Sequence, residues 1–209
     1  MKLSILIPVH NERYTVEQVV RAALAAPLPA DVDREVVVVD DGSTDGTLAA
    51  IERLAFEAQL VRTLAHKTRR GRGASLATAI EAATGDVCVF QDADLEYDPS
   101  EYAKLLQPIL DGCADAVFGT RVGASGYRRA LHFRQGLMLR RATAFSNWFT
   151  NIDLSDLTCG LKMARTMLLR VRALALRRIF ARCRIGRQVR EARVSGLRSA
   201  GFLPRSKCA

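Results

Sequence analysis

Three acidic side chains, Asp92, Asp94 and Glu96, occupy alternate positions directly after a short apolar run over residues 87–90. Alternate residues of an extended chain point to the same side, so this spacing predicts three carboxylates on one face. Carboxylate oxygens suit Mg2+ or Mn2+, and such ions usually keep positions open for the phosphates of a substrate. The alternative is a solvated acidic turn, but like charges held together without a counter-ion cost stability. We therefore predict a metal site and phosphate chemistry.

Two further polar segments follow apolar runs. Residues 40–47 read Asp-Asp-Gly-Ser-Thr-Asp-Gly-Thr and come directly after the valine-rich run 35–39. This composition is typical of a plain turn that caps a helix, and the alternative is that Asp41 accepts hydrogen bonds from a nucleobase or a ribose. Glu12, which follows the first apolar run, could receive donors from a base. His10 taken alone is more typical of a packing or stacking residue.

A third candidate is a basic loop rich in glycine. Gly71 and Gly73 flank Arg72, and Arg69 and Arg70 come just before them. The loop could cradle phosphates, although its spacing matches no phosphate-loop pattern. A solvated basic loop that enters a helix is an equal alternative.

The elements that must position these residues alternate between strand and helix along the chain. Apolar runs predict strands over residues 3–9, 35–39, 60–64, 87–90 and 115–119. Helical periodicity predicts helices over residues 16–24, 47–58 and 74–83, and another from residue 99. Thr15 and Gln18 fit a capping box, and Asp98 with Pro99 fits a helix start. Such alternation with short links predicts an α/β fold in which helices flank a mainly parallel central sheet.

The candidate segments share one place in this predicted sheet. Residues 8–12, 40–47 and 92–96 each follow the carboxyl end of a predicted strand. Ligands of open parallel sheets bind outside that edge. This agreement in location supports a common binding site more strongly than any single motif does.

Length and composition indicate a globular protein with a core of ordinary size. The chain has 209 residues, of which 49% are hydrophobic and 25% charged, and this predicts one main domain. The five cysteines are odd in number and lack the paired spacing of a metal site, so we expect a reducing, intracellular location. No run approaches the ~18 apolar residues of a membrane span, and the first apolar run is too short for a signal peptide. We expect a cytoplasmic protein, at most peripheral at the inner face of a membrane.

The net charge of +9 is concentrated at one end of the chain. Residues 166–209 hold eleven arginines and one lysine but a single acid, Glu191, and so carry +11, whereas residues 1–165 carry −2. We therefore predict one domain over residues 1–165 and an arginine-rich segment over residues 166–209, atypical in composition and open to being poorly ordered. The alternatives for this segment are a basic tail for a membrane or nucleic acid, and a shifted reading frame. Without interleaved aromatic residues, no specific nucleic-acid partner is expected.

A second basic stretch contains a helical stripe of apolar residues. Met138, Ala142, Phe145 and Phe149 recur at helical spacing, which predicts an ordinary amphipathic helix packed on the core. The alternative is a helix that lies on a membrane surface and meets anionic lipid. That alternative would use the nearby arginines, which are Arg128, Arg129, Arg134, Arg140 and Arg141.

Five segments, in their order along the chain, resemble the family 2 glycosyltransferases. They are residues 7–12, 39–47, 91–96, 119–121 and 155–158, and together they span roughly residues 1–165. The resemblance is greatest to the dolichyl- and polyprenyl-phosphate mannosyl- or glucosyltransferases. It implies a nucleotide-diphospho-sugar transferase of the GT-A type, which is a Rossmann-like fold. The combination of segments is specific, whereas the turn motif alone is not.

The resemblance also implies roles for individual residues. The nucleotide would be held by Pro8, His10, Glu12, Val39 and Asp41. Asp92, Ala93 and Asp94 would contact the sugar donor and a bound Mg2+ or Mn2+, with Glu96 as the third residue on the metal side. Arg121 would lie beside the diphosphate, where a guanidinium can bind two oxygens at once.

The family's acceptor is the phosphate of a long polyprenol, and this bears on which residues would be catalytic. A phosphate monoester with its second pKa near ~6 is largely dianionic at neutral pH, so it needs little help from a general base. Asp156 is the best candidate for such a base, but it could equally cap or orient the loop 155–158. Asp94 and Arg121 are the other catalytic candidates implied by the resemblance.

The resemblance implies an inverting, metal-dependent transfer of a hexose from a nucleotide-diphospho-sugar to a polyprenyl phosphate, in cell envelope biogenesis. One alternative is another family 2 transfer, onto a sugar hydroxyl of a polysaccharide or lipid glycan. The resemblance fades after about residue 165, where relatives carry a segment that closes over the donor. A second alternative is therefore an inactive remnant that still binds the donor.

Overall fold

The computed structural model describes residues 1–120, 133–151, 153–171 and 189–193. The strands within them are β1 (Lys2–Val9), β2 (Asp33–Asp40), β3 (Val61–Ala65), β4 (Val87–Phe90), β5 (Ala116–Thr120), β6 (Lys162–Arg165) and β7 (Val189–Arg193). The helices are α1 (Val16–Ala25), α2 (Thr47–Glu57), α3 (Arg72–Ala82), the short 3-10 helix η1 (Pro99–Glu101), α4 (Tyr102–Leu110) and α5 (Phe133–Thr150). Residues 166–171, which follow β6, are also helical.

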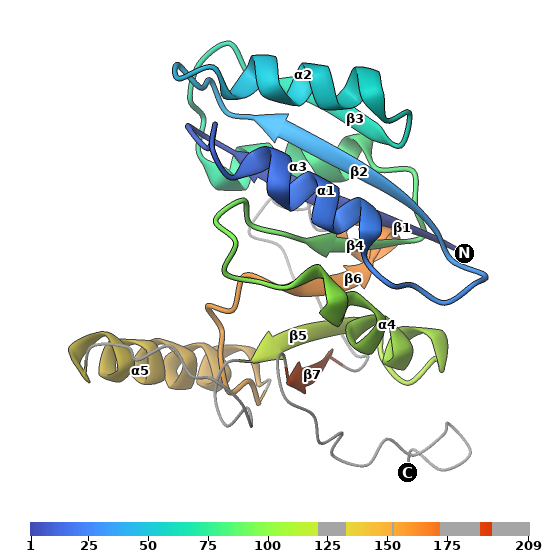
Figure 1. The fold of residues 1–209 in the computed structure, drawn as a ribbon. Helices are drawn as coiled ribbons and strands as arrows, with labels where there is room; N and C mark the ends of the chain where they lie inside the picture. The colour runs from blue at the N-terminus through green and yellow to red at the C-terminus, as the bar shows by residue number, and fades with distance from the viewer. Residues whose placement is uncertain (121–132, 152, 172–188, 194–209) are drawn as a thin grey trace.

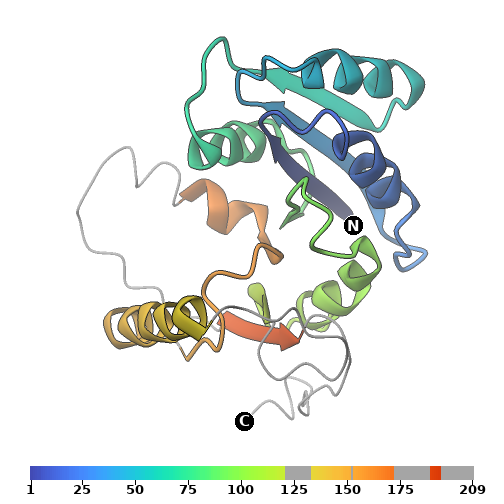
Figure 2. The ribbon, with the colours of Figure 1, turned by 60° about the vertical axis from the view of Figure 1, so that its left-hand side comes forward.

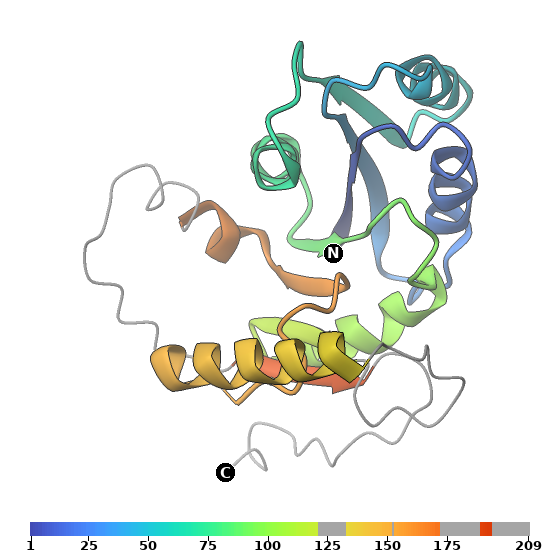
Figure 3. The same ribbon diagram turned by 90° about the vertical axis from the view of Figure 1, so that its left-hand side faces the viewer.

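Within these residues, the seven strands join one sheet in the order β3-β2-β1-β4-β6-β5-β7 (Figure 1). β1 pairs in parallel with both β2 and β4, and β2 pairs in parallel with β3. Helices cover both faces, and Figure 3 shows α3 on one side of β1 and β2 and α1 on the other. The predicted α/β fold, with a mainly parallel central sheet flanked by helices, is confirmed.

The valine run of β2 shows why its sequence is apolar throughout. Val36 and Val38 pack in the core cluster that includes residues of α1 and α2, whereas Val37 and Val39 pack in the cluster beneath α3. All four side chains are completely buried. Alternate residues of a strand face opposite sides, so a strand covered by helices on both faces needs apolar residues at every position. This double burial holds β2 in register and presents Asp41, just past its end, at the edge of the sheet.

β6 lies between β4 and β5 and is antiparallel to both. The sequence does not predict this strand, because two of its four residues are basic and it has no apolar run. Its position means that β4 and β5 do not pair with each other. The chain that leads into β6 therefore reaches the carboxyl end of β4, where the predicted site lies.

Two predicted helix starts have different outcomes. Asp98 caps η1 as predicted, because its side chain accepts a hydrogen bond from the backbone N–H of Ser100 at 2.9 Å. The predicted capping box of Thr15 and Gln18 is wrong, because the Thr15 side chain makes no capping bond to α1. Its hydroxyl instead donates to the Glu12 carboxylate at 2.7 Å. Thr15 thus orients an acidic side chain of the candidate site.

α5 lies at the end of the molecule opposite α2 (Figures 1 and 2). Its predicted apolar stripe does not pack on the core: the side chains of Met138, Phe145 and Phe149 are 72%, 66% and 74% exposed. Trp148 beside them is 85% exposed. The packing prediction for this stripe is therefore wrong. Among the described residues, none of the helices is both long and apolar enough to cross a membrane.

α5 is instead attached through polar contacts with the chain that follows it. The Asn147 amide donates to the backbone oxygen of Leu154 at 2.8 Å and accepts from the Leu154 N–H at 3.2 Å. The Thr143 side chain of α5 is buried, and its hydroxyl accepts a hydrogen bond from the N–H of Leu157 at 3.4 Å. These contacts join α5 to residues 154–157, while Met138, Phe145, Trp148 and Phe149 remain exposed.

The predicted boundary between residues 165 and 166 stays a prediction. The helix over residues 166–171 follows β6 directly, and the buried Thr166 hydroxyl donates to the backbone oxygen of Gly85 at 2.6 Å. β7 pairs in parallel with β5 as the last strand of the sheet. Residues 172–188 and 194–209, the rest of the predicted segment, lie outside the described residues.

Candidate active site

The carboxyl ends of β1, β2 and β4 meet at a cavity of about 330 Å3. Seven of the predicted site residues line this cavity, and they are Pro8, His10, Glu12, Asp41, Asp92, Ala93 and Asp94. Arg69 and Arg72 of the basic loop line it as well, together with Val9 and Ser75. The three segments predicted to share one edge of the sheet are therefore brought together, and the arginine loop closes a fourth side.

The other predicted residues lie elsewhere. Val39 is completely buried inside β2 and is not part of the cavity wall. Glu96 is exposed and also outside the wall. Arg121 lies outside the described residues, as do Arg128 and Arg129.

Asp41 holds the arginine loop in place. Its Oδ1 accepts from the His66 ring at 2.8 Å and from the Arg70 N–H at 2.9 Å, and its Oδ2 accepts from the Gly71 N–H at 2.7 Å. Burial by itself raises the pKa of Asp41, but the hydrogen bonds from His66, Arg70, Gly71 and Ser75 outweigh burial and lower the pKa to about 2. A carboxylate has about four acceptor positions. At Asp41 they are taken by His66, Arg70 and Gly71, with Ser75 as a further donor. This pattern favours an anchor for the loop over the predicted direct acceptor for a base.

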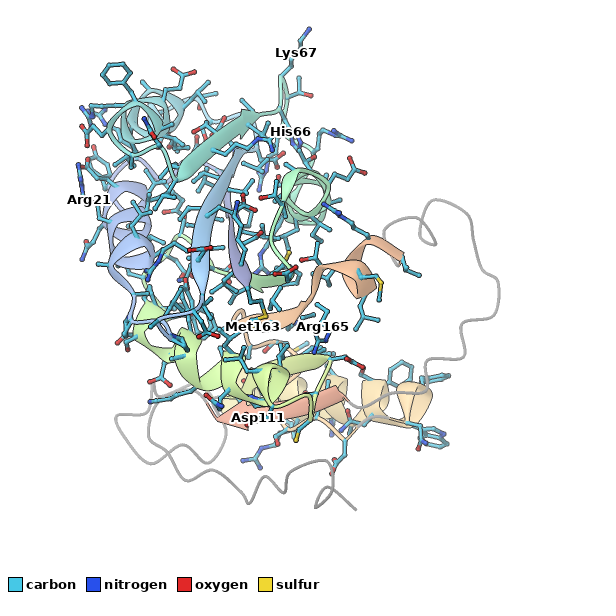
Figure 4. The ribbon with its side chains drawn as sticks, turned by 90° about the vertical axis from the view of Figure 1, so that its right-hand side faces the viewer. Arg21, His66, Lys67, Asp111, Met163 and Arg165 are labelled. Atoms are coloured by element: carbon cyan, nitrogen blue, oxygen red, sulfur yellow. The ribbon has the colours of Figure 1, made fainter. Side chains whose placement is uncertain are left out.

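His66 is a functional candidate that sequence reasoning missed. It follows β3, its side chain is 7% exposed, and its second ring nitrogen lies 3.0 Å from the Thr78 hydroxyl of α3. The ring therefore links Asp41 to α3. The next residue, Lys67, points away from the molecule (Figure 4). The sequence indicates a role for His66 only through its position, because it follows a predicted strand at the same edge of the sheet as the other candidates.

The acidic triplet does not form the predicted row of three carboxylates. β4 ends at Phe90, Leu95 has a φ of 61°, and the Glu96 N–H donates to Asp94 Oδ1 at 3.1 Å. The chain after β4 is thus a turn, so alternate residues do not share one face. No three His, Cys, Asp or Glu side chains in the described part of the chain lie together as a metal site. The expected row of three carboxylates on one face is therefore wrong. Of the triplet, Asp92 and Asp94 line the cavity and Glu96 does not, and the role of these residues as metal ligands stays a prediction.

Those two carboxylates fit a divalent cation in their chemistry. Arg72 donates to Asp92 Oδ1 at 2.5 Å. Burial raises the pKa of Asp92, Arg72 lowers it, and the nearby Asp94 raises it again, so that the pKa lies above its ordinary value. Burial is therefore the main cause of the raised pKa of Asp92, and Arg72 offsets it only in part. Two carboxylates beside an open cavity suit Mg2+ or Mn2+, which take oxygen ligands and leave positions for phosphate oxygens.

Asp156 caps its own loop. It is completely buried, and its Oδ1 accepts from both the backbone N–H and the hydroxyl of Thr158 at 3.0 Å. A general base has to come within hydrogen-bond reach of the group it deprotonates. The two bonds to Thr158 are those of the capping alternative, and a role of Asp156 as general base stays a prediction.

Gly160 is a second residue that sequence reasoning missed. A Cβ at this position would overlap the Asp92 carboxylate and would lie 2.7 Å from the Tyr97 ring. The Gly160 N–H donates to the Tyr97 hydroxyl at 2.8 Å. Glycine therefore allows the chain before β6 to pass directly beside Asp92. Any larger residue here would displace either the Asp92 side chain or the backbone at position 160.

One family model and several known proteins match this chain. A family model described as Glycosyl transferase family 2 matches residues 4–173. The chain is 34% identical over 165 residues to Glycosyltransferase AglD of Haloferax volcanii, and the match covers 78% of this chain and 26% of that protein. It is 29% identical over 166 residues to the Polyprenol monophosphomannose synthase of Mycolicibacterium smegmatis, and this match covers 77% of this chain and 60% of that protein. The chain thus spans less than two thirds of the length of these relatives.

The solved structures of two known enzymes are also similar to this chain. The mannosyltransferase PcManGT from Pyrobaculum calidifontis, in complex with GDP-Man and Mn2+, matches with a TM-score of 0.59 and 25% identity over 81% of this chain and 46% of that chain. The glucosyl-3-phosphoglycerate synthase from Mycobacterium tuberculosis, in complex with Mn2+, UDP-glucose and phosphoglyceric acid, matches with a TM-score of 0.60 and 26% identity over 80% of this chain and 57% of that chain. With its sheet, its cavity and the match over residues 4–173, the chain belongs to glycosyl transferase family 2.

Proposed function

We propose that this chain transfers a hexose from a nucleotide-diphospho-sugar to the phosphate of a polyprenol. The observation that carries the proposal is the cavity at the ends of β1, β2 and β4, which Asp92 and Asp94 line together with Arg69 and Arg72. A nucleotide-diphospho-sugar needs carboxylates that hold a metal ion and guanidinium groups that bind its phosphates, and this cavity offers both. Similarity to a polyprenol monophosphomannose synthase supports the choice of acceptor.

The donor would lie along the edge of the sheet. Pro8, His10 and Glu12 form the wall at the end of β1, where the nucleotide would bind. Arg72 has a side chain that is 54% exposed and pairs with Asp92, so it can exchange that carboxylate for a phosphate oxygen without a large loss of buried contacts. Asp41 contributes indirectly, because it anchors the loop that presents Arg69.

Asp92 and Asp94 would hold Mg2+ or Mn2+. When bound, such an ion supplies positive charge that neutralises the departing nucleoside diphosphate. The complexes of two similar proteins with Mn2+ support a divalent ion here.

The acceptor phosphate would act as its own nucleophile. A phosphate oxygen forms a bond to the anomeric carbon while the bond from that carbon to the diphosphate oxygen breaks, and the electron pair leaves with the nucleoside diphosphate. Attack from the opposite face inverts the anomeric centre. Because a phosphate monoester is already ionised at neutral pH, no buried base is required, and this agrees with the capping role of Asp156.

A panel of UDP- and GDP-sugars, each with and without Mn2+, tests the proposal. We expect at least one donor to raise the melting temperature in a Mn2+-dependent way, and to be turned over with a short polyprenyl phosphate but not with the matching polyprenol. The sugar product would be identified by mass spectrometry. Donor binding without any turnover would instead favour an inactive remnant.

A second acceptor class has support from one similar structure. The glucosyl-3-phosphoglycerate synthase was solved with phosphoglyceric acid, which is not a lipid. Transfer to a hydroxyl of a small molecule or a glycan therefore remains the alternative. Turnover of the bound donor onto such a hydroxyl, with none onto polyprenyl phosphate, would select it.

We also propose that α5 contacts an anionic membrane at its surface. The support is its outward-facing apolar side chains, among them Phe145 and Trp148, together with the exposed Arg140 and Arg141. Apolar and basic side chains on one helix bind the interface of anionic bilayers. Such contact would bring the site close to a lipid acceptor.

Vesicle flotation tests this contact. We expect the chain to float with vesicles that contain anionic lipid and much less with neutral ones. The double variant Phe145→Ser, Trp148→Ser should lose most of the flotation. Phe56 of α2 is 92% exposed, so Phe56→Ser is a matched control that should keep it. Equal flotation of the chain with both vesicle types would contradict the proposal.

A further inference from the structure

Lys162 lies at the same edge of the sheet as the cavity. It is the first residue of β6, and because β6 is antiparallel, that first residue pairs with Phe90, the last residue of β4. On its other side it pairs with Phe118 of β5. The sheet order places β6 next to β4, on the side away from β1 and β2. Lys162 is therefore one strand beyond Asp92 and Asp94, which follow β4.

The ammonium group of Lys162 is held without a close anion. The residue is half-buried, and its Nζ lies 5.4 Å from the centre of the Phe118 ring, a cation–π distance. Within the described part of the chain, no carboxylate lies within ion-pair distance of this Nζ. The aromatic ring thus fixes a positive charge at the edge of the site and leaves its hydrogen-bond donors for another group.

The charges around Lys162 also favour binding of an anion. Burial lowers the pKa of Lys162, Arg72 lowers it further, and Cys159, Asp156 and Asp92 offset these effects only in part. Two of these residues, Arg72 and Asp92, line the cavity. A dianionic group bound between Arg72 and Lys162 would stabilise both cations, and the interaction would be strong because the site is partly removed from water.

We propose that Lys162 binds the phosphate of the acceptor. This inference rests on the proposed function and names the residue that would recognise its acceptor. The acceptor is favoured over the donor diphosphate because of position. The nucleotide would bind at the ends of β1 and β2, whereas Lys162 does not line the cavity and lies on the opposite side of β4 from these two strands.

The test compares Lys162→Met with the wild-type chain. Methionine keeps an unbranched apolar stem over Phe118 and removes the charge. We expect the affinity for a short isoprenyl phosphate, measured by calorimetry in the presence of Mn2+ and nucleoside diphosphate, to fall by about 10- to 100-fold, the usual worth of a hydrogen bond to a charged group. The affinity for the nucleotide sugar should change by less than about twofold, and KM for the acceptor should rise with the lost affinity.

Two further variants keep the result interpretable. Lys162→Arg preserves the charge and should recover part of the affinity. Arg53 of α2 has a side chain that is 62% exposed, so Arg53→Gln removes one positive charge on the surface and should change nothing. If Lys162→Met is too unstable to assay, Lys162→Gln is measured in its place and the same loss is expected.

Other outcomes would overturn the proposal. A loss of nucleotide-sugar affinity with unchanged isoprenyl phosphate affinity would assign Lys162 to the donor. Unchanged affinity for both would make Lys162 a structural residue. Failure of the proposed function looks different: the wild-type chain would transfer no sugar to isoprenyl phosphate, or would bind isoprenyl phosphate no better than isoprenol. Lys162 can be wrongly assigned while wild-type transfer to the phosphate succeeds.

Discussion

Asp94→Asn is expected to abolish Mn2+-dependent binding of the donor and to slow sugar transfer by about a thousandfold, if an ion at this site contributes several kcal/mol. Asp92 and Asp94 are the two carboxylates that we propose as metal ligands, so this change removes half of the negative charge that they offer to the ion. Asparagine keeps the size of the side chain and its ability to accept the Glu96 N–H, so the turn after β4 should be preserved. Calorimetric titration with donor at several Mn2+ concentrations would measure the effect.

Glu96→Gln provides the comparison that distinguishes two ligands from three. Glu96 is exposed and lies outside the cavity wall, so we expect its replacement to cost far less than that of Asp94. Similar losses in Glu96→Gln and Asp94→Asn would show that the loop rearranges when donor binds and that the three-carboxylate site forms after all. Full activity of Asp94→Asn would remove the metal assignment.

Asp41→Asn is expected to lower the free energy of unfolding by about 2 to 3 kcal/mol and to weaken donor binding strongly. Asp41 accepts hydrogen bonds from His66, Arg70 and Gly71. An amide NH2 would face one of these donors, and each buried donor left without a partner costs roughly 1–3 kcal/mol. The arginine loop would lose its anchor, so Arg69 and Arg72 would be presented less well. Chemical denaturation and donor titration would measure the two effects.

The pH dependence gives an independent check on Asp41. Its pKa of about 2 in the folded chain lies below the ordinary value of 3.8, so its contribution to stability is complete above pH 3.8 and is lost as the pH falls toward 2. The stability difference between the wild-type chain and Asp41→Asn should therefore be constant at neutral pH and shrink in acid. Asp33→Asn, at the exposed opposite end of β2, is the control and should show neither effect. Loss of donor binding at unchanged stability would instead favour direct contact between Asp41 and the nucleotide.

Much of the sheet could be predicted because its strands are buried on both faces. The valines of β2 form an unbroken apolar run, which is what a central parallel strand requires. The polar residues directly after such runs then had to lie at one edge, and the cavity contains them. Position along a strand thus predicted the place of Glu12, Asp41 and Asp92 better than any motif did.

Other features depend on contacts between distant parts of the chain. β6 is a strand because it fits between β4 and β5, and not because of its own four residues. The acidic triplet has the spacing of a strand, but the chain turns at Leu95, which has a positive φ. The stripe of α5 has a regular helical pattern, yet sequence alone does not decide whether Phe145 and Phe149 face a core or the outside. His66 stands alone in the sequence and becomes significant only beside Asp41 and Thr78.

The insertion of β6 between β4 and β5 has a consequence for how this chain folds. β1 to β4 are complete once residue 90 has been made, and they can pair as they emerge during synthesis. β5 joins them only through β6, so it must wait until residues 162–165 exist. Until then β4 has an open edge of unpaired backbone groups, the kind of surface through which partly folded chains aggregate. Closing this long loop is slow compared with local contacts. The edge that carries Asp92, Gly160 and Lys162 is therefore assembled late, and a chain released before β6 would lack a complete site.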